Sequence, residues 1–282
     1  MRIPRPRRVT SVIVPLTLAL PAAGLLFAGP AAASPAGTPQ VGQYDHVAAP
    51  AVTGAEKSRD DAKQAQALKH TQARQAAALS PNAVTPNTTA KTLGVSYQQQ
   101  VDSTWCGPAT LAIILGYKGW GWSGTASQQQ TSAANLLGVP HNGDGTPWQG
   151  SDNVPLGGPW VSSYPMQDAL NYRDYVKTGN TYWAVHALPG SPSSGDVTEY
   201  KNDLTTDIDL NYPFANNEYA APGYEIGKQP GGMWIYHWFA ANGYSNSGST
   251  TIFSDPGWGG GSKSSDTTHN VVVALGGRGY IW

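Results

Sequence analysis

The run QQQVDSTWCGPATLAIIL, residues 98–115, decides the fold because it marks the start of a helix. Pro108 is tolerated in a first helical turn, where its missing N–H has no partner to lose. Apolar residues at helical spacing and two glycine stops follow, namely Leu111, Ile114, Leu115, Gly116 and Gly119. We therefore predict a helix over residues 106–117, with Cys106 at its first position.

Cys106 is the single cysteine of the 282-residue chain, so it cannot form an internal disulfide. At a helix start, unpaired N–H groups and the positive end of the dipole stabilise a thiolate, which is the form that attacks a carbonyl. Gly107 leaves room for a substrate backbone to approach. The alternative is an inert, buried side chain, which would more often lie in the middle of a helix.

The first 33 residues have the features of a secretory signal. Arginines are concentrated in the first eight residues, and an uncharged, largely apolar stretch follows at 9–27. Ala31 and Ala33 have the small-x-small spacing that a signal peptidase needs. Arg7 and Arg8 leave twin-arginine export open beside the general route. We expect cleavage after Ala33 and a secreted protein without stable membrane insertion.

Residues 34–92 are rich in Ala, Pro, Thr and Gln and cannot build a core. Within them, residues 56–79 consist largely of strong helix formers and predict a helix that ends before Ser80 and Pro81. A weak apolar stripe runs along this predicted helix: Ala62, Ala65, Leu68, Ala76 and Leu79. The segment is either an inhibitory pro-segment or a solvated linker, and the small apolar area favours the linker.

Residues 93–282 form one predicted domain in which helices precede strands. Three further ranges have helical patterns: 127–137, 165–175 and 197–210. Four later ranges are β-branched or aromatic and are bounded by turn residues: 233–244, 250–254, 269–275 and 279–282. Two ranges have the composition of long Gly-, Pro- and Asn-rich insertions: 140–160 and 215–232. The order predicts an α+β fold, with N-terminal helices packed on a C-terminal antiparallel β-sheet.

A thiolate nucleophile needs a histidine base and a group that orients it. His237 lies in MWIYHWFAANGY, and Asp255 follows in TTIFSDPGWG. The midpoint between the two residues is 246, which lies inside a predicted turn. In a hairpin centred there, the two side chains would be directly opposite, with Cβ atoms about 5 Å apart. Asp255 would then hold the imidazole in the required tautomer. Taken singly, each residue is more simply a strand histidine or a turn former.

The other histidines are weaker candidates. His269 opens the next predicted strand and is the alternative base. His46 and His70 lie in the low-complexity segment, and His141 and His186 lie in predicted loops, where a solvated surface histidine is expected.

Acyl chemistry also needs hydrogen-bond donors for the developing oxyanion. The backbone N–H of Cys106 is one candidate. The side-chain amide of Gln100, six residues earlier, could supply another, although spacing alone does not separate it from Gln98 and Gln99.

Gln100 followed by Cys106-Gly107-Pro108-Ala109, then a late strand with His237, then Asp255-Pro256, is a pattern that resembles a known family. It is similar to the papain-like peptidases related to bacteriocin-processing, double-glycine leader peptidases, including their exported stand-alone relatives. The resemblance covers roughly residues 95–260. It implies that Cys106 is the nucleophile, His237 the base, Asp255 the orienting residue and Gln100 the oxyanion donor. The two predicted insertions depart from the leader-processing branch, so its double-glycine specificity is not carried over.

The leading hypothesis is a secreted cysteine peptidase that hydrolyses peptide bonds through a thioester, with no metal or organic cofactor. Its expected partner is a peptide or protein substrate, including a cell-wall peptide, and the protein is expected to be a monomer. Nucleic acid is excluded because the 13 lysines and arginines beyond residue 8 face 18 acidic residues. A transglutaminase-like or cell-wall amidase activity with the same triad is one alternative. A non-catalytic wall- or peptide-binding platform is the other, built from Trp120, Trp122, Trp148, Trp160, Trp183 and Trp258.

Overall fold

The computed structural model describes residues 52–79, 89–139, 164–258 and 262–282. Its helices are α1 (Gly54–Leu79), α2 (Cys106–Tyr117), α3 (Ala126–Leu137), α4 (Pro165–Thr178), α5 (Ser194–Asp209), the short 3-10 helix η1 (Asn246–Gly248) and α6 (Thr268–Ala274). Its strands are β1 (Lys91–Thr92), β2 (Val185–Ala187), β3 (Phe214–Ala220), β4 (Ile235–Ser245), β5 (Thr250–Ser254), β6 (Lys263–Thr267) and β7 (Gly279–Ile281). The predicted signal and the predicted insertion at 140–160 lie outside the described residues.

The strands form one antiparallel sheet in the order β2-β7-β3-β4-β5-β6. The short strand β1 pairs with the C-terminal end of β4. β4 is the longest strand and lies near the middle, so its side chains are covered along almost its whole length. The α+β class expected from the order of helical and strand patterns is therefore confirmed.

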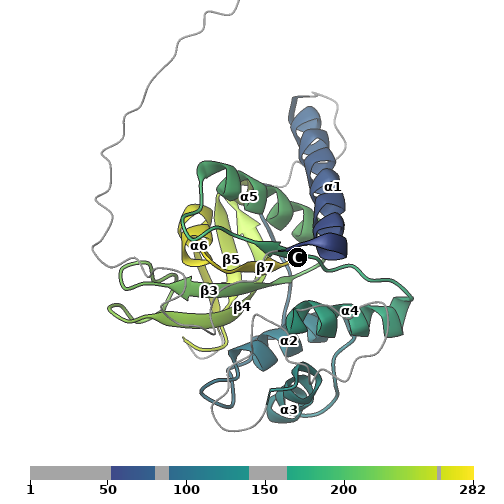
Figure 1. The fold of residues 1–282 in the computed structure, drawn as a ribbon, viewed down its shortest axis with the longest axis vertical. Coiled ribbons are helices and arrows are strands. Elements are labelled where there is room, and N and C mark those ends of the chain that lie inside the picture. The colour runs from purple at the N-terminus through teal and green to yellow at the C-terminus, as the bar shows by residue number, and fades with distance from the viewer. Residues whose placement is uncertain (1–51, 80–88, 140–163, 259–261) are drawn as a thin grey trace, which may run out of the picture. The chain divides into compact units, whose positions relative to one another are not determined.

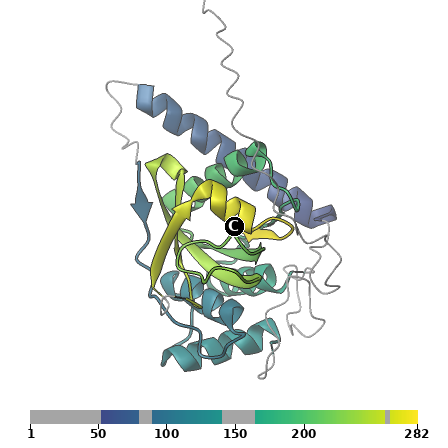
Figure 2. The ribbon, with the colours of Figure 1, turned by 90° about the vertical axis from the view of Figure 1, so that its left-hand side faces the viewer.

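The helices lie in two groups with the sheet between them (Figures 1 and 2). α2, α3 and α4 pack on one another, and α2 also packs against β4. α1, α5 and α6 form the other group, in which α5 contacts both α1 and α6. Within the described part of the chain, no helix has the length and apolarity needed to cross a membrane.

Helix α2 is the centre of the first group. Its bounds are those predicted, and Cys106–Leu115 are all buried. A helix that is apolar on every side belongs inside a domain, so α2 is held by contacts all round and not by one amphipathic face. Its N-terminal residue, Cys106, is thereby fixed relative to β4.

The segment predicted as a strand at 269–275 is instead helix α6, so this prediction was wrong. Thr267 caps the helix by accepting a hydrogen bond from the backbone N–H of Asn270. Val271 and Val272 are completely buried. Capping and helical packing override the β preference of these branched side chains.

The predicted insertion at 215–232 begins inside strand β3, all seven residues of which are buried. The strand includes Asn216, Asn217 and Glu218, which are polar and therefore indicated a loop. Buried polar groups cost free energy unless they are paired, so these three side chains need partners inside the sheet.

Helix α1 packs on the domain through the face opposite to the predicted apolar stripe. Leu68, from that stripe, is 52% exposed, whereas Asp60, Lys63 and Ala67 are buried. Lys63 Nζ lies 3.4 Å from Asp207 Oδ2 and also lies over the Tyr182 and Trp282 rings. The helix is therefore part of the folded unit, held by polar contacts that a search for apolar stripes does not detect.

Candidate active site

A cleft of about 530 Å³ opens between the N-terminus of α2 and strand β4. Its lining brings together three separate parts of the chain: Gln99, Gln100, Val101, Asp102, Ser103, Thr104, Cys106, Tyr236, His237, Gly257 and Trp258. Three of the residues predicted from the sequence, Gln100, Cys106 and His237, thus share one surface. Asp255 lies directly behind it and is completely buried.

His237 and Asp255 are in direct contact. The His237 Nε2 donates to Asp255 Oδ1 over 2.8 Å, and only 3% of His237 is exposed. The same Asp255 oxygen accepts the backbone N–H groups of Gly257 and Trp258 over 2.8 and 3.1 Å. The carboxylate is therefore fixed by the turn that follows β5, and it fixes the imidazole in turn.

The predicted hairpin register was wrong even though the two side chains meet. Ala240 pairs with Ser254, and a bulge follows at Ala241/Gly243. Continuing that pairing would set His237 opposite Gly257, two residues beyond Asp255. The contact is accordingly a diagonal one, made by a residue of the turn and not by a directly opposite strand residue.

Cys106 lines the same cleft as His237 and acts on its imidazole. A hydrogen bond between the side chains of Cys106 and His237 contributes to the electrostatics of the ring, and Nε2 is already directed at Asp255. As the first residue of α2, Cys106 has a backbone N–H without a partner inside the helix, and no side chain caps this helix start. Such an uncapped N-terminus favours an anion beside it.

The charges of the site reinforce one another. Burial alone would lower the pKa of His237, but the hydrogen bonds to Asp255 and Cys106 and their negative charges outweigh it and raise that pKa to about 10. Burial opposes ionisation of Asp255, yet its bonds to His237, Trp258 and Gly257 lower its pKa. The arrangement is suited to an imidazolium held between two anionic groups.

Gln100 lies at the cleft because its loop is tied on two sides. Its backbone N–H donates to Pro256 O over 2.9 Å, while the neighbouring Val101 N–H donates to the buried side chain of Gln130 on α3. Gln98 instead bonds Gln129, which separates it from Gln100. The Gln100 amide nitrogen donates to the carbonyls of Asp102 and Ser103 over 3.1 and 2.7 Å. In this structure the amide is therefore directed at the loop and not into the cleft.

Two residues that the sequence pattern did not assign to the site complete it. A Cβ added at Gly257 would lie 2.8 Å from His237 Cε1, so only glycine leaves room for the ring. Trp258 covers the same ring edge to face, with centroids 4.7 Å apart. The position of Gly257 and Trp258 directly after Asp255-Pro256 was the available signal, but their roles depend on the bulged register.

The remaining histidines lie elsewhere. His269 is exposed on α6 and does not line the cleft. His186, expected as a solvated loop residue, is partly buried, and its Nδ1 lies 2.9 Å from Asp60 Oδ2. His70 belongs to α1, and its Nε2 lies 3.4 Å from Asp209. His46 and His141 lie outside the described residues.

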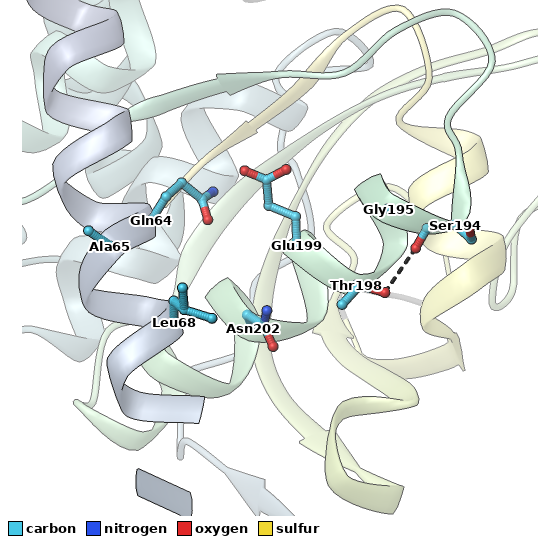
Figure 3. A pocket seen from close by; sticks show the side chains of 8 residues that line it. All are labelled: Gln64, Ala65, Leu68, Ser194, Gly195, Thr198, Glu199 and Asn202. Carbon is cyan, nitrogen blue, oxygen red and sulfur yellow. Dashed lines mark hydrogen bonds between the residues drawn. The ribbon is translucent and has the colours of Figure 1, made fainter. Parts of the chain in front are cut away.

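A second hollow lies between α1 and α5 (Figure 3). It is lined by Gln64, Ala65, Leu68, Ser194, Gly195, Thr198, Glu199 and Asn202. None of these eight side chains is a thiol or an imidazole, and none belongs to the cleft. Across the described ranges, no group of three or more His, Cys, Asp or Glu residues is placed to hold a metal ion.

The four tryptophans of the considered platform that lie in the described part of the chain are all at least partly buried. Trp183 is completely buried, and Trp258 packs on His237. Trp120 and Trp122 are partly buried against the core. Trp148 and Trp160 lie outside the described residues.

Comparison with known proteins gives one family. The model of the Peptidase_C39 like family matches residues 92–273, a range that contains the whole cleft and Asp255. No curated protein and no solved structure matches the chain significantly. With a seven-stranded antiparallel sheet, a helix that begins at a cysteine and a family match over most of the described domain, the chain belongs to the Peptidase_C39 like family and is related to the papain-like cysteine peptidases.

Proposed function

We propose that the protein is a secreted cysteine peptidase that hydrolyses peptide bonds through Cys106, His237 and Asp255. The observation that carries the proposal is a single imidazole that donates through Nε2 to a carboxylate and lines the same cleft as the only thiol of the chain. Structural histidines rarely need both partners, whereas a nucleophile, its base and the group that orients the base require this geometry.

In the proposed reaction, the Cys106 thiolate attacks the scissile carbonyl carbon and forms a tetrahedral intermediate. The C–N bond then breaks, and the His237 imidazolium gives its proton to the leaving amine. A water molecule, deprotonated by His237, next attacks the thioester. The C–S bond breaks, the acid product leaves, and the thiolate and imidazolium are restored with one water consumed.

The negative oxygen of the intermediate needs donors. The Cys106 backbone N–H is one, because α2 supplies it no intrahelical partner. Gln100 supplies the second after its amide rotates away from the carbonyls of Asp102 and Ser103. A charged acceptor favours this exchange because hydrogen bonds to ions are stronger than those to neutral carbonyls.

The substrate is a peptide or protein outside the cytoplasm, and the protein is an exported relative of the leader-processing peptidases. The arginine-rich start and the apolar stretch at 9–27 support export. Sequencing the N-terminus of protein recovered from culture medium tests this point. Ser34 as the first residue is expected, and retention of the intact chain inside the cell would contradict it.

The activity itself is tested by incubating the reduced protein separately with casein and with cell-wall peptides. New peptide termini are expected with the wild type and with His269→Gln, and none with Cys106→Ser or His237→Gln. Activity that survives both substitutions would overturn the proposal. New isopeptide links without new termini would instead show transfer to an amine by the same thioester.

A further inference from the structure

Glu218 is a completely buried carboxyl group beside the candidate catalytic histidine. It lies on β3 and pairs directly with His237 on β4 in the antiparallel register. Directly opposite residues have Cβ atoms about 4.5–5.5 Å apart and side chains on the same face of the sheet. The Cys106–His237–Asp255 arrangement described above does not use Glu218.

The two carboxyl oxygens of Glu218 have different surroundings. Gln229 Nε2 donates to Oε2 over 2.5 Å, and the Gln229 amide is fixed because its own oxygen accepts the Ile226 N–H. Oε1 is buried and, among the described residues, has no hydrogen-bond partner. A buried carboxylate with one partnerless oxygen is costly, so the site favours the protonated acid at neutral pH.

We propose that Glu218 is a positioning residue of this active site: its carboxyl group supports the His237 ring from the neighbouring strand and, by gaining or losing a proton, sets the charge that the imidazole experiences. The inference deepens the proposed function, on which it rests. The segment between β3 and β4 also contributes to the site, because its residue Gln229 holds the Glu218 carboxyl group that acts on His237.

The electrostatics agree with the geometry. Burial raises the pKa of Glu218 to about 8, against the opposing effects of the His237 charge and the Gln229 bond, and the negative charges of Asp255 and Cys106 add to the rise. Glu218 is thus neutral at pH 7 and becomes negative above about pH 8. A negative charge opposite His237 then stabilises the imidazolium, so the ionised form of Glu218 raises the pKa of His237 in the alkaline range.

The other charged groups near β3 were compared with Glu218 as sources of the charge that acts on His237. On the neighbouring β7 side, Arg278 interacts with Tyr219 and Tyr236. On α6, which packs against β3, His269 is exposed. The titratable groups with the largest effects on Glu218 are the three of the proposed triad.

The test uses Glu218→Gln, which keeps the shape and the acceptor for Gln229 but cannot ionise. Glu199→Gln, the same change on α5, is the matched control. The full-length protein is labelled with carbon-13 at histidine Cε1, and the His237 signal, identified by its loss in His237→Gln, is followed from about pH 6 to about pH 11. Thermal unfolding verifies that each variant is folded.

Glu218→Gln is expected to lower the His237 titration midpoint by about one pH unit and to remove the inflection near pH 8. Glu199→Gln should change neither. A His237 curve that superimposes on the wild type in folded Glu218→Gln overturns the inference. This readout needs no substrate, so an inactive wild type with the expected shift would count against the proposed function alone.

Discussion

Gly257→Ala should disable the site without unfolding the protein. The new Cβ would lie 2.8 Å from His237 Cε1 and 3.3 Å from both His237 Nε2 and Gln100 Oε1. Carbon atoms in ordinary contact are about 3.5–4.0 Å apart, so the ring would have to retreat by about 0.7–1.2 Å. The ring is buried between Trp258 and Asp255, and a retreat of this size lengthens its bonds to Asp255 and Cys106.

A misplacement of about 1 Å costs up to about a hundredfold in rate, so kcat/KM on casein peptides should fall by about ten- to a hundredfold, or about 1.4–2.7 kcal/mol. Gly116→Ala is the matched control, because it lies on α2 without a positive φ and its new methyl group would meet no atom within 4 Å. It should keep wild-type activity and gain up to about 1 kcal/mol in stability. A folded Gly257→Ala protein with undiminished activity would refute the crowding described for the ring.

Asp255→Asn should lower kcat by about a hundredfold or more, because an amide neither stabilises the imidazolium nor enforces its tautomer; unchanged kcat with unchanged folding would contradict this. The partners of His237 outweigh the effect of burial and raise the His237 pKa to about 10. The value of kcat/KM should therefore stay constant through neutral pH and decline above about pH 10, as the imidazolium is lost. A decline centred near the ordinary histidine pKa would contradict the pairing of His237 with Asp255 and Cys106. Lys63→Ala should reduce the free energy of unfolding by about 3–5 kcal/mol, because it leaves Asp207 buried without its cation. Lys57→Ala, on the exposed side of α1, should leave the thermal midpoint unchanged, and equal midpoints for both variants would show that α1 does not stabilise the domain.

The start of α2 could be predicted because its signals are local. Pro108, the apolar spacing and the glycines all act within a few residues of Cys106, and the observed bounds agree with the expected ones. The helix α6 could not be predicted in the same way. Its valines favour a strand locally, and their burial against the rest of the domain decides otherwise.

The site shows the same division. Cys106, His237 and Asp255 were selected as candidates from residue type and order, which follow from the chemistry. The bulge at Ala241/Gly243 was not foreseeable from spacing, and it moves Gly257 to the position opposite His237. Glu218 was missed because its strand is polar in sequence and buried in the fold.

Helix α1 was misjudged for a related reason. The small area of its apolar stripe favoured a solvated linker, whereas Asp60 accepts a hydrogen bond from Trp282 and pairs with His186, and Lys63 pairs with Asp207. Polar docking depends on which groups the rest of the fold supplies, and the sequence of the helix alone does not reveal them.

The central claim is that Cys106 and His237 form a reactive thiolate–imidazolium pair. It is tested most directly by the rate at which iodoacetamide alkylates Cys106 at about pH 6, because Cys106 is the only thiol in the chain. An ordinary free thiol is about 0.3% ionised at that pH, so the denatured chain reacts slowly. The native protein is expected to react at least about ten times faster than the denatured chain. A native rate below the denatured one would show an inert buried thiol and contradict the claim.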